Sequence, residues 1–189
     1  MFPPLVGPAQ TFAIVISFVL GAMVGSFLNV CVYRMPRGLS IVKPRSRCPK
    51  CDRDIKWFDN VPILSWLALG AKCRHCGQPI SWQYPLVEAI TGALFLFVYL
   101  RFGLTLATPI YMVLVASLVV VTFVDLTDWT IPNEITIPGV LIGIGCSLIA
   151  EVYPESGLLL VGPLNALIGA AVGFMILYGM DKAALLLLG

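Results

Sequence analysis

The chain has 189 residues, of which 59% are hydrophobic and only 12% are charged, with a formal net charge of +2. Soluble globular domains carry about 25% charged residues, so this composition, with a mean hydropathy of +0.93, excludes that class of protein. The charge is also unevenly placed, because ten of the twelve Lys and Arg lie between Arg34 and Arg74. The sequence therefore predicts an integral membrane protein with one strongly basic loop.

The first apolar segment, residues 11–32, is long enough to cross a bilayer, because about 20 helical residues at roughly 1.5 Å each match the hydrocarbon thickness. Arg34 and Arg37 follow this segment and no charged residue precedes it, which is not the pattern of a cleaved signal peptide. Basic loops stay on the cytoplasmic side. We therefore expect residues 1–33 to form a first transmembrane helix with its N-terminus outside, and residues 34–84 to form a cytoplasmic loop domain. Its basic residues favour the lipid bilayer as partner, and not nucleic acid.

The loop contains two cysteine pairs, Cys48-Pro-Lys-Cys51 and Cys73-Arg-His-Cys76. A two-residue spacer lets both sulfurs of a pair reach one ion, and two such pairs about twenty residues apart are typical of a closed structural zinc site. Two disulfides or a redox-active pair are the alternatives, and neither suits a reducing cytosol or a sequence without a βαβ pattern. We expect Cys48, Cys51, Cys73 and Cys76 to bind zinc, with Asp52 and His75 as neighbours. Cys31 and Cys146 lie in apolar runs and read as small buried hydrophobic residues.

Further apolar segments span residues 85–100, 102–124, 131–150 and 158–178, and residues 183–189 open another. Polar residues at 101, 125–130, 151–157 and 180–182 mark the expected turns, and Pro132 with Glu134 indicates a helix start. Counting the crossings places Asp125 and Asp181 at the same, cytoplasmic face. The fold class predicted is an all-α, polytopic transmembrane helical bundle with a small zinc-binding cytoplasmic loop, residues 85–189 forming the rest of the bundle.

Asp125 and Asp181 are the carboxylates that could carry chemistry at that face. Ionisable groups near membrane depth are expensive and tend to be kept for a function. Two carboxyls within hydrogen-bonding range do not both ionise easily, so one can activate water while the other polarises a peptide carbonyl. The alternative is a pair of solvated helix-end carboxylates, and Asp128 competes with Asp125. A proton-coupled transporter is a further alternative, but it would place ionisable groups deeper along a pore.

Taken in order, these segments resemble the type IV prepilin peptidases, the bifunctional leader peptidase/N-methyltransferases of bacterial pilus and type II secretion systems. The resemblance covers residues from about 25 to 138 and is carried by several stretches: Gly25-Ser26-Phe27-Leu28-Asn29-Val30 with Tyr33-Arg34 and Pro36, Ser46-Arg47-Cys48-Pro49-Lys50-Cys51, Asp59-Asn60-Val61-Pro62-Ile63-Leu64-Ser65-Trp66-Leu67, Lys72-Cys73-Arg74-His75-Cys76, and Ile80 to Glu88 with Thr91-Gly92.

The resemblance implies that Asp125, in Val124-Asp125-Leu126 followed by Ile131-Pro132, is the first catalytic aspartate. The second belongs to a Gly-x-Gly-Asp motif, which corresponds here to Gly179-Met180-Asp181-Lys182, with Met180 in the place of a glycine. The family continues for further membrane helices, so we expect this chain to represent a C-terminally truncated or incomplete polypeptide.

The implied activity is cleavage of the leader peptide of prepilins or pseudopilins at the cytoplasmic face of the inner membrane. The family commonly also methylates the new N-terminus with S-adenosylmethionine, and the resemblance assigns no residue here to that cofactor. Because the loop is basic, a basic leader would need local acids such as Asp52, Asp54 or Asp59. A non-catalytic zinc-bearing scaffold of a pilus or secretion assembly is the alternative.

Overall fold

The structure, a computed structural model, describes residues 7–159 and 162–188. Within these ranges the chain is helical and forms no β-strand, only two isolated bridges that pair Arg47 with Asp54 and Lys72 with Pro79. In the described part of the chain, five helices are long and apolar enough to cross a membrane: α1 (Pro8–Arg34), α3 (Gln83–Phe102), α4 (Ala107–Asp128), α5 (Asn133–Val152) and α6 (Pro163–Leu188). The expected all-α, multi-pass architecture is confirmed.

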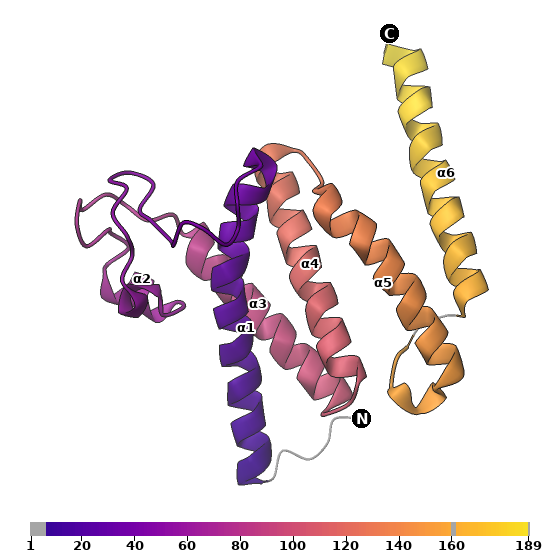
Figure 1. The fold of residues 1–189 in the computed structure, drawn as a ribbon, viewed down its shortest axis with the longest axis horizontal. Coiled ribbons are helices and arrows are strands. Elements are labelled where there is room, and N and C mark those ends of the chain that lie inside the picture. The colour runs from indigo at the N-terminus through magenta and orange to yellow at the C-terminus, as the bar shows by residue number, and fades with distance from the viewer. Residues whose placement is uncertain (1–6, 160–161, 189) are drawn as a thin grey trace. The chain divides into compact units, whose positions relative to one another are not determined.

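Two compact units divide the chain, residues 1–136 and residues 137–189. The first unit holds α1, α3, α4 and the basic loop, which runs from the end of α1 to the start of α3 (Figure 1). The loop contains the short helix α2 (Leu64–Ala68) and two 3₁₀ turns, η1 (Met35–Arg37) and η2 (Trp57–Asn60).

Close packing of α1 against α3 depends on glycines in both helices. A Cβ at Gly21 would lie 2.7 Å from the carbonyl oxygen of Thr91, and one at Gly25 would lie 2.7 Å from the Cα of Glu88. Small residues let membrane helices approach until their backbones touch. Gly92 makes the matching approach from α3, where a Cβ would meet the ring of Phe18 at 2.9 Å.

The core of the first unit lies where α4 joins this pair. It is built from apolar residues of all three helices: Leu28, Cys31 and Val32 of α1, Val87 of α3, and Val119, Val120 and Val124 of α4. Val87 and Val124 are fully buried. The burial of Cys31 here, and of Cys146 in α5, confirms that both are small buried hydrophobic residues.

Helix ends fall where the sequence supplies breakers. Gly103 ends α3 with φ of 63°, and Trp129 ends α4 in the left-handed region with φ of 55°. Pro132 then precedes α5, which has Glu134 in its first turn, so the expected helix start is confirmed. The turn between α4 and α5 falls at residues 129–132, and Asp125 therefore lies inside the last turn of α4 rather than in the turn itself.

The second unit contains most of α5, the 3₁₀ turn η3 (Pro154–Ser156) and α6. The sequence predicted a turn at residues 180–182 and a new helix from 183, and this is wrong, because α6 runs without a break from Pro163 to Leu188. Residues 180–188 contain no glycine or proline, and their Met, Lys, Ala and Leu residues are strong helix formers. Apolar character alone could not show whether the helix stops there.

Candidate metal centre and candidate active site

Two similar hairpins hold the four loop cysteines. In the first, the Asp52 N–H donates to the Cys48 carbonyl at 2.9 Å; in the second, the Gly77 N–H donates to the Cys73 carbonyl at 2.9 Å. The residue after each second cysteine takes a left-handed conformation, with φ of 53° at Asp52 and 68° at Gly77. Glycine adopts it freely and Asp tolerates it better than most residues. Each Cys-x-x-Cys segment is thereby folded back so that its two sulfurs face one point.

The hairpins meet so that the sulfurs of Cys48, Cys51, Cys73 and Cys76 all lie within 4.8 Å of one another. The Cys48 and Cys76 Sγ atoms are 3.9 Å apart. A tetrahedral ion about 2.3 Å from each sulfur would separate the sulfurs by about 3.8 Å, so the donor set fits such an ion. The four predicted ligands are thus brought together in a cluster that could hold a metal.

The neighbouring polar residues are engaged elsewhere. The Asp52 carboxylate pairs with Arg47 at 3.3 Å, and the His75 Nδ1 lies 3.3 Å from an Arg53 guanidinium nitrogen. Neither belongs to the metal cluster, as expected. Backbone N–H groups of Cys76 and His75 point at the Cys73 sulfur and lower its pKa to about 6. Cys73 is therefore set up as a thiolate, which is the form that binds metal.

Two side chains fasten this loop to the membrane helices, and a third joins the helices themselves. The Arg34 guanidinium donates to the loop carbonyl oxygens of Ser40 at 2.8 Å and Pro44 at 2.9 Å, while the Asn29 amide of α1 donates to the Tyr84 carbonyl in the first turn of α3 at 3.1 Å. The Ile63 backbone N–H donates to the Glu88 carboxylate at 2.7 Å. The sequence analysis gave Glu88 no role beyond its place in the stretch from Ile80 to Glu88. An acidic residue in an otherwise uncharged membrane segment was a signal that Glu88 has a specific role, but it did not indicate the partner.

The loop acids expected to attract a basic leader are all paired within the loop. Arg47 forms ion pairs with Asp52 at 3.3 Å and with Asp54 at 2.8 Å. Arg74 holds Asp59 through two nitrogens, with the shortest contact 2.6 Å, and lowers the pKa of that carboxyl by hydrogen bonding. Each of these carboxylates thus neutralises a loop cation; Asp59 is covered, whereas Asp52 and Asp54 stay exposed to solvent.

Asp125 and Asp128 differ in what surrounds their carboxylates. Asp128 is bound by Arg37 at 3.4 Å and by the Thr127 hydroxyl at 3.0 Å. Asp125 is exposed, and no side chain of the described residues forms an ion pair or hydrogen bond with its carboxylate. Asp128 is thus tied to the loop through Arg37, while Asp125 stays exposed to solvent. The choice of Asp125 as the catalytic acid stays a prediction.

Asp181 lies on α6, and its side chain is outside the described residues. It belongs to the second unit and Asp125 to the first. The pairing of the two carboxylates therefore stays a prediction of the crossing count.

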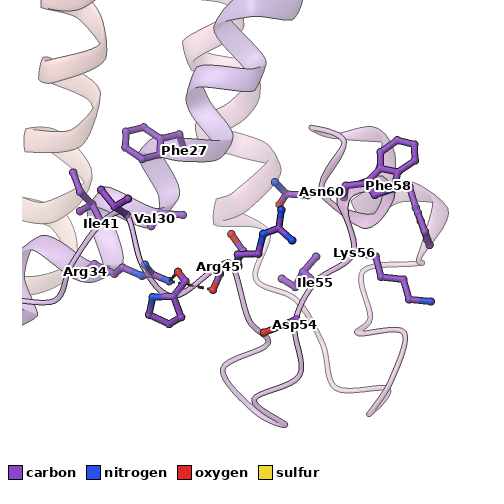
Figure 2. Close-up of a pocket in the computed structure, with 14 residues that line it drawn as sticks. Phe27, Val30, Arg34, Ile41, Arg45, Asp54, Ile55, Lys56, Phe58 and Asn60 are labelled. Carbon is purple, nitrogen blue, oxygen red and sulfur yellow. Dashed lines mark hydrogen bonds between the residues drawn. The ribbon is translucent and has the colours of Figure 1, made fainter.

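Two cavities lie where the loop meets the membrane helices. One of about 690 Å³ is bounded by Ser26 and Asn29 of α1, Tyr84 and Glu88 of α3, and Cys73 of the metal cluster. The other, of about 630 Å³, is shown in Figure 2, where Phe27, Val30 and Arg34 of α1 face loop residues that include Ile55 and Phe58. Both are of the size that small ligands occupy.

Comparisons with known proteins agree with these features. The family model for the bacterial peptidase A24 N-terminal domain matches residues 19–102, and that for the type IV leader peptidase family matches residues 112–188. No solved structure matches the chain.

Curated relatives of the chain carry the name prepilin leader peptidase/N-methyltransferase, and three of them illustrate the similarity. The chain is 50% identical over 158 residues to the protein of Myxococcus xanthus (strain DK1622), covering 84% of this chain and 45% of the relative. It is 33% identical over 202 residues to that of Neisseria gonorrhoeae, covering 94% and 68%. For Bacillus subtilis (strain 168) the identity is 36% over 166 residues, covering 86% and 62%. The chain thus spans between about half and two thirds of the length of these relatives.

Proposed function

Because the chain belongs to the type IV leader peptidase family, we propose that it is a membrane aspartic endopeptidase that removes the leader peptide of type IV prepilins and pseudopilins. The observation that carries this is the exposed carboxylate of Asp125 in the last turn of α4, which no side chain of the described residues engages and which lies inside the region matched to the peptidase family. The names of the relatives, prepilin leader peptidase/N-methyltransferase, support the substrate class. A non-catalytic scaffold is not favoured by these relatives.

In the proposed reaction Asp125 and Asp181 act as a pair. Two carboxyl groups within hydrogen-bonding range share one proton, because ionising both would place two negative charges side by side. The ionised member removes a proton from water, which attacks the scissile carbonyl carbon while the protonated member donates to the carbonyl oxygen. The carboxyl that took the proton from water then gives it to the amide nitrogen, and the tetrahedral intermediate collapses with cleavage of the peptide C–N bond. The products are the leader with a new carboxyl group and the mature pilin with a new amine.

The cytoplasmic face of the bacterial inner membrane is the proposed place of cleavage, with the N-terminus of the chain outside. Arg34 and Arg37 at the end of α1 support this orientation, because basic residues next to a membrane helix stay inside. Arg37 also pairs with Asp128, one turn from Asp125, which ties the catalytic end of α4 to the same basic side. The leader of a prepilin is cut next to an apolar helix that itself lies in the membrane. A catalytic site at the end of a membrane helix would therefore lie at the same depth as the cleavage point.

Zinc is the metal we propose for the four-cysteine cluster, since four thiolates in a closed tetrahedral set are its preferred structural site. Its proposed role is to hold the two hairpins together. We further propose that the chain transfers a methyl group from S-adenosylmethionine to the new N-terminus. The 690 Å³ cavity between the loop, α1 and α3 is our candidate for the methyl donor, because its size suits such a molecule.

Incubation of the protein, reconstituted in vesicles, with a prepilin and S-adenosylmethionine tests both activities. Mass spectrometry should show a pilin that has lost its leader and gained one methyl group. Omission of S-adenosylmethionine should leave the cleaved, unmethylated pilin. An intact prepilin under all conditions, with the protein correctly inserted, would contradict the proposed peptidase.

A further inference from the structure

The basic loop contains an uncharged stretch, residues 60–71. It begins directly after Asp59, the one charged residue between Trp57 and Leu69. Asp59 is itself covered: its side chain is 8% exposed and is held by Arg74 at 2.6 Å. The segment from Trp57 to Leu69, which we name the apolar loop segment, therefore presents no free charge, although it lies in the part of the chain that carries most of the cations.

The apolar loop segment has a definite inner and outer side. On the inner side the Trp66 indole N–H donates to the Ile80 carbonyl at 3.2 Å, and the Ser65 hydroxyl donates to the Phe58 carbonyl at 3.0 Å. On the outer side Trp57, Leu64 and Leu67 are 83%, 65% and 61% exposed. Exposed apolar patches of this kind mark surfaces that contact a membrane or another protein.

The depth of the segment follows from its contacts with the membrane helices. The Ile63 N–H binds the Glu88 carboxylate, and the Glu88 Cα lies against Gly25 of α1. Gly25 precedes Arg34 by nine residues, which is about 13 Å along the helix axis. Half the hydrocarbon thickness is about 15 Å. With Arg34 at the membrane surface, a segment held beside Gly25 therefore lies within the cytoplasmic half of the bilayer. In Figure 1, α2 lies beside the first turns of α3, well short of the C-terminal end of α1.

We propose that the apolar loop segment is immersed in the cytoplasmic leaflet of the bilayer, with Leu64 and Leu67 among the acyl chains and Trp57 near the headgroups. We favour lipid over a protein as the partner of this exposed surface, because the segment lies beside α1 and α3 at the same depth in the membrane. Its flanks also match a lipid surface, since Lys56 directly precedes the apolar loop segment, Lys72 follows it by three residues, and anionic headgroups attract such cations. The proposal does not depend on the proposed peptidase activity.

Photo-crosslinking in membranes tests this placement. A benzophenone amino acid is incorporated separately at Leu64, at Leu67 and, as the matched control, at the exposed Lys50 in the first metal hairpin. The protein is reconstituted in vesicles of phosphatidylethanolamine and phosphatidylglycerol and irradiated. Phospholipid adducts are expected by mass spectrometry at positions 64 and 67 and not at 50. Adducts at 50 equal to those at 64 and 67, or crosslinks from 64 and 67 to a second protein copy in place of lipid, would overturn the proposal.

A second measurement leaves the leucines untouched. Lipids brominated near the top of the acyl chain quench tryptophan at the interface, so the Trp57→Phe variant should lose part of the quenching shown by the wild-type protein. Trp66→Phe is the control, because Trp66 is turned inward by its bond to Ile80. An unchanged quenched fraction in Trp57→Phe would contradict the placement of Trp57 at the headgroups.

Discussion

Glu88 of α3 and Ile63 of the loop, 25 residues apart in sequence, are joined by a hydrogen bond of 2.7 Å from the Ile63 N–H to the carboxylate. Ile63 has φ of 62°, and the Leu64 N–H donates to the Pro62 carbonyl across it, so the chain makes a tight γ-turn at a β-branched residue. Such a conformation costs on the order of 1–3 kcal/mol and persists only where the surroundings hold it. Glu88, which is buried, supplies that support.

Replacement of this carboxylate should therefore loosen the loop. Glu88→Ala leaves the Ile63 N–H without its acceptor and should cost about 1–3 kcal/mol of local stability. The measurement is amide hydrogen exchange of residues 61–66 in nanodiscs, which should become faster. Glu88→Gln keeps an acceptor oxygen and should exchange at a rate closer to wild type. Equal protection in Glu88→Ala and wild type would contradict a fastening role.

The contact between α1 and α3 predicts a second outcome. Gly25→Ala places a Cβ 2.7 Å from the Glu88 Cα and 3.0 Å from the Val87 carbonyl oxygen, so the helices must separate. Overpacking of this kind costs typically about 1–3 kcal/mol, and the Tm in detergent should fall. Gly143→Ala is the control: apart from the neighbouring residues and backbone of its own helix, no atom of the described residues lies within 4 Å of the added Cβ, and Ala gains about 1 kcal/mol over Gly inside a helix. If the two variants lost stability equally, close packing at Gly25 would not be the cause.

Metal content gives a third prediction. The purified protein should contain about one zinc per chain, as a single four-thiolate site requires. Cys48→Ser should abolish this content and expose the loop to proteolysis, whereas Cys146→Ala, which alters a cysteine outside the cluster, should retain it. Elemental analysis measures both. Zinc retained in Cys48→Ser, or absent from protein kept reduced and free of chelators, would contradict the assignment.

These results separate what the sequence could predict from what it could not. The spacing of Cys48, Cys51, Cys73 and Cys76 predicted the cluster because a Cys-x-x-Cys pair folds locally. Segment hydropathy predicted the ends of α1, α3 and α5 to within three residues and those of α4 to within five. The tie between Ile63 and Glu88 was not predictable, since it joins residues brought together only by the packing of α3 on α1. The continuity of α6 through residue 181 was missed because a polar residue does not by itself end a helix.

The ion pair between Asp59 and Arg74 gives a pH prediction. Hydrogen bonds from Arg74 lower the pKa of Asp59 below its ordinary value of 3.8. The stability that this pair contributes is therefore fully present above pH 3.8 and is lost as the pH falls through the lowered pKa. The Tm difference between the wild type and Asp59→Asn should be constant from about pH 7 to 5 and shrink below pH 4. A difference that grows on acidification would contradict this pairing.

Leader cleavage by two neighbouring variants tests the proposed activity most directly. Asp125→Asn should abolish cleavage of a prepilin by the membrane-reconstituted protein, because it removes the carboxylate that we propose to activate water together with Asp181. Asp128→Asn, which changes the acid paired with Arg37 three residues away, should cleave at a rate near wild type. Normal processing by Asp125→Asn, with the variant inserted in the membrane, would contradict the account.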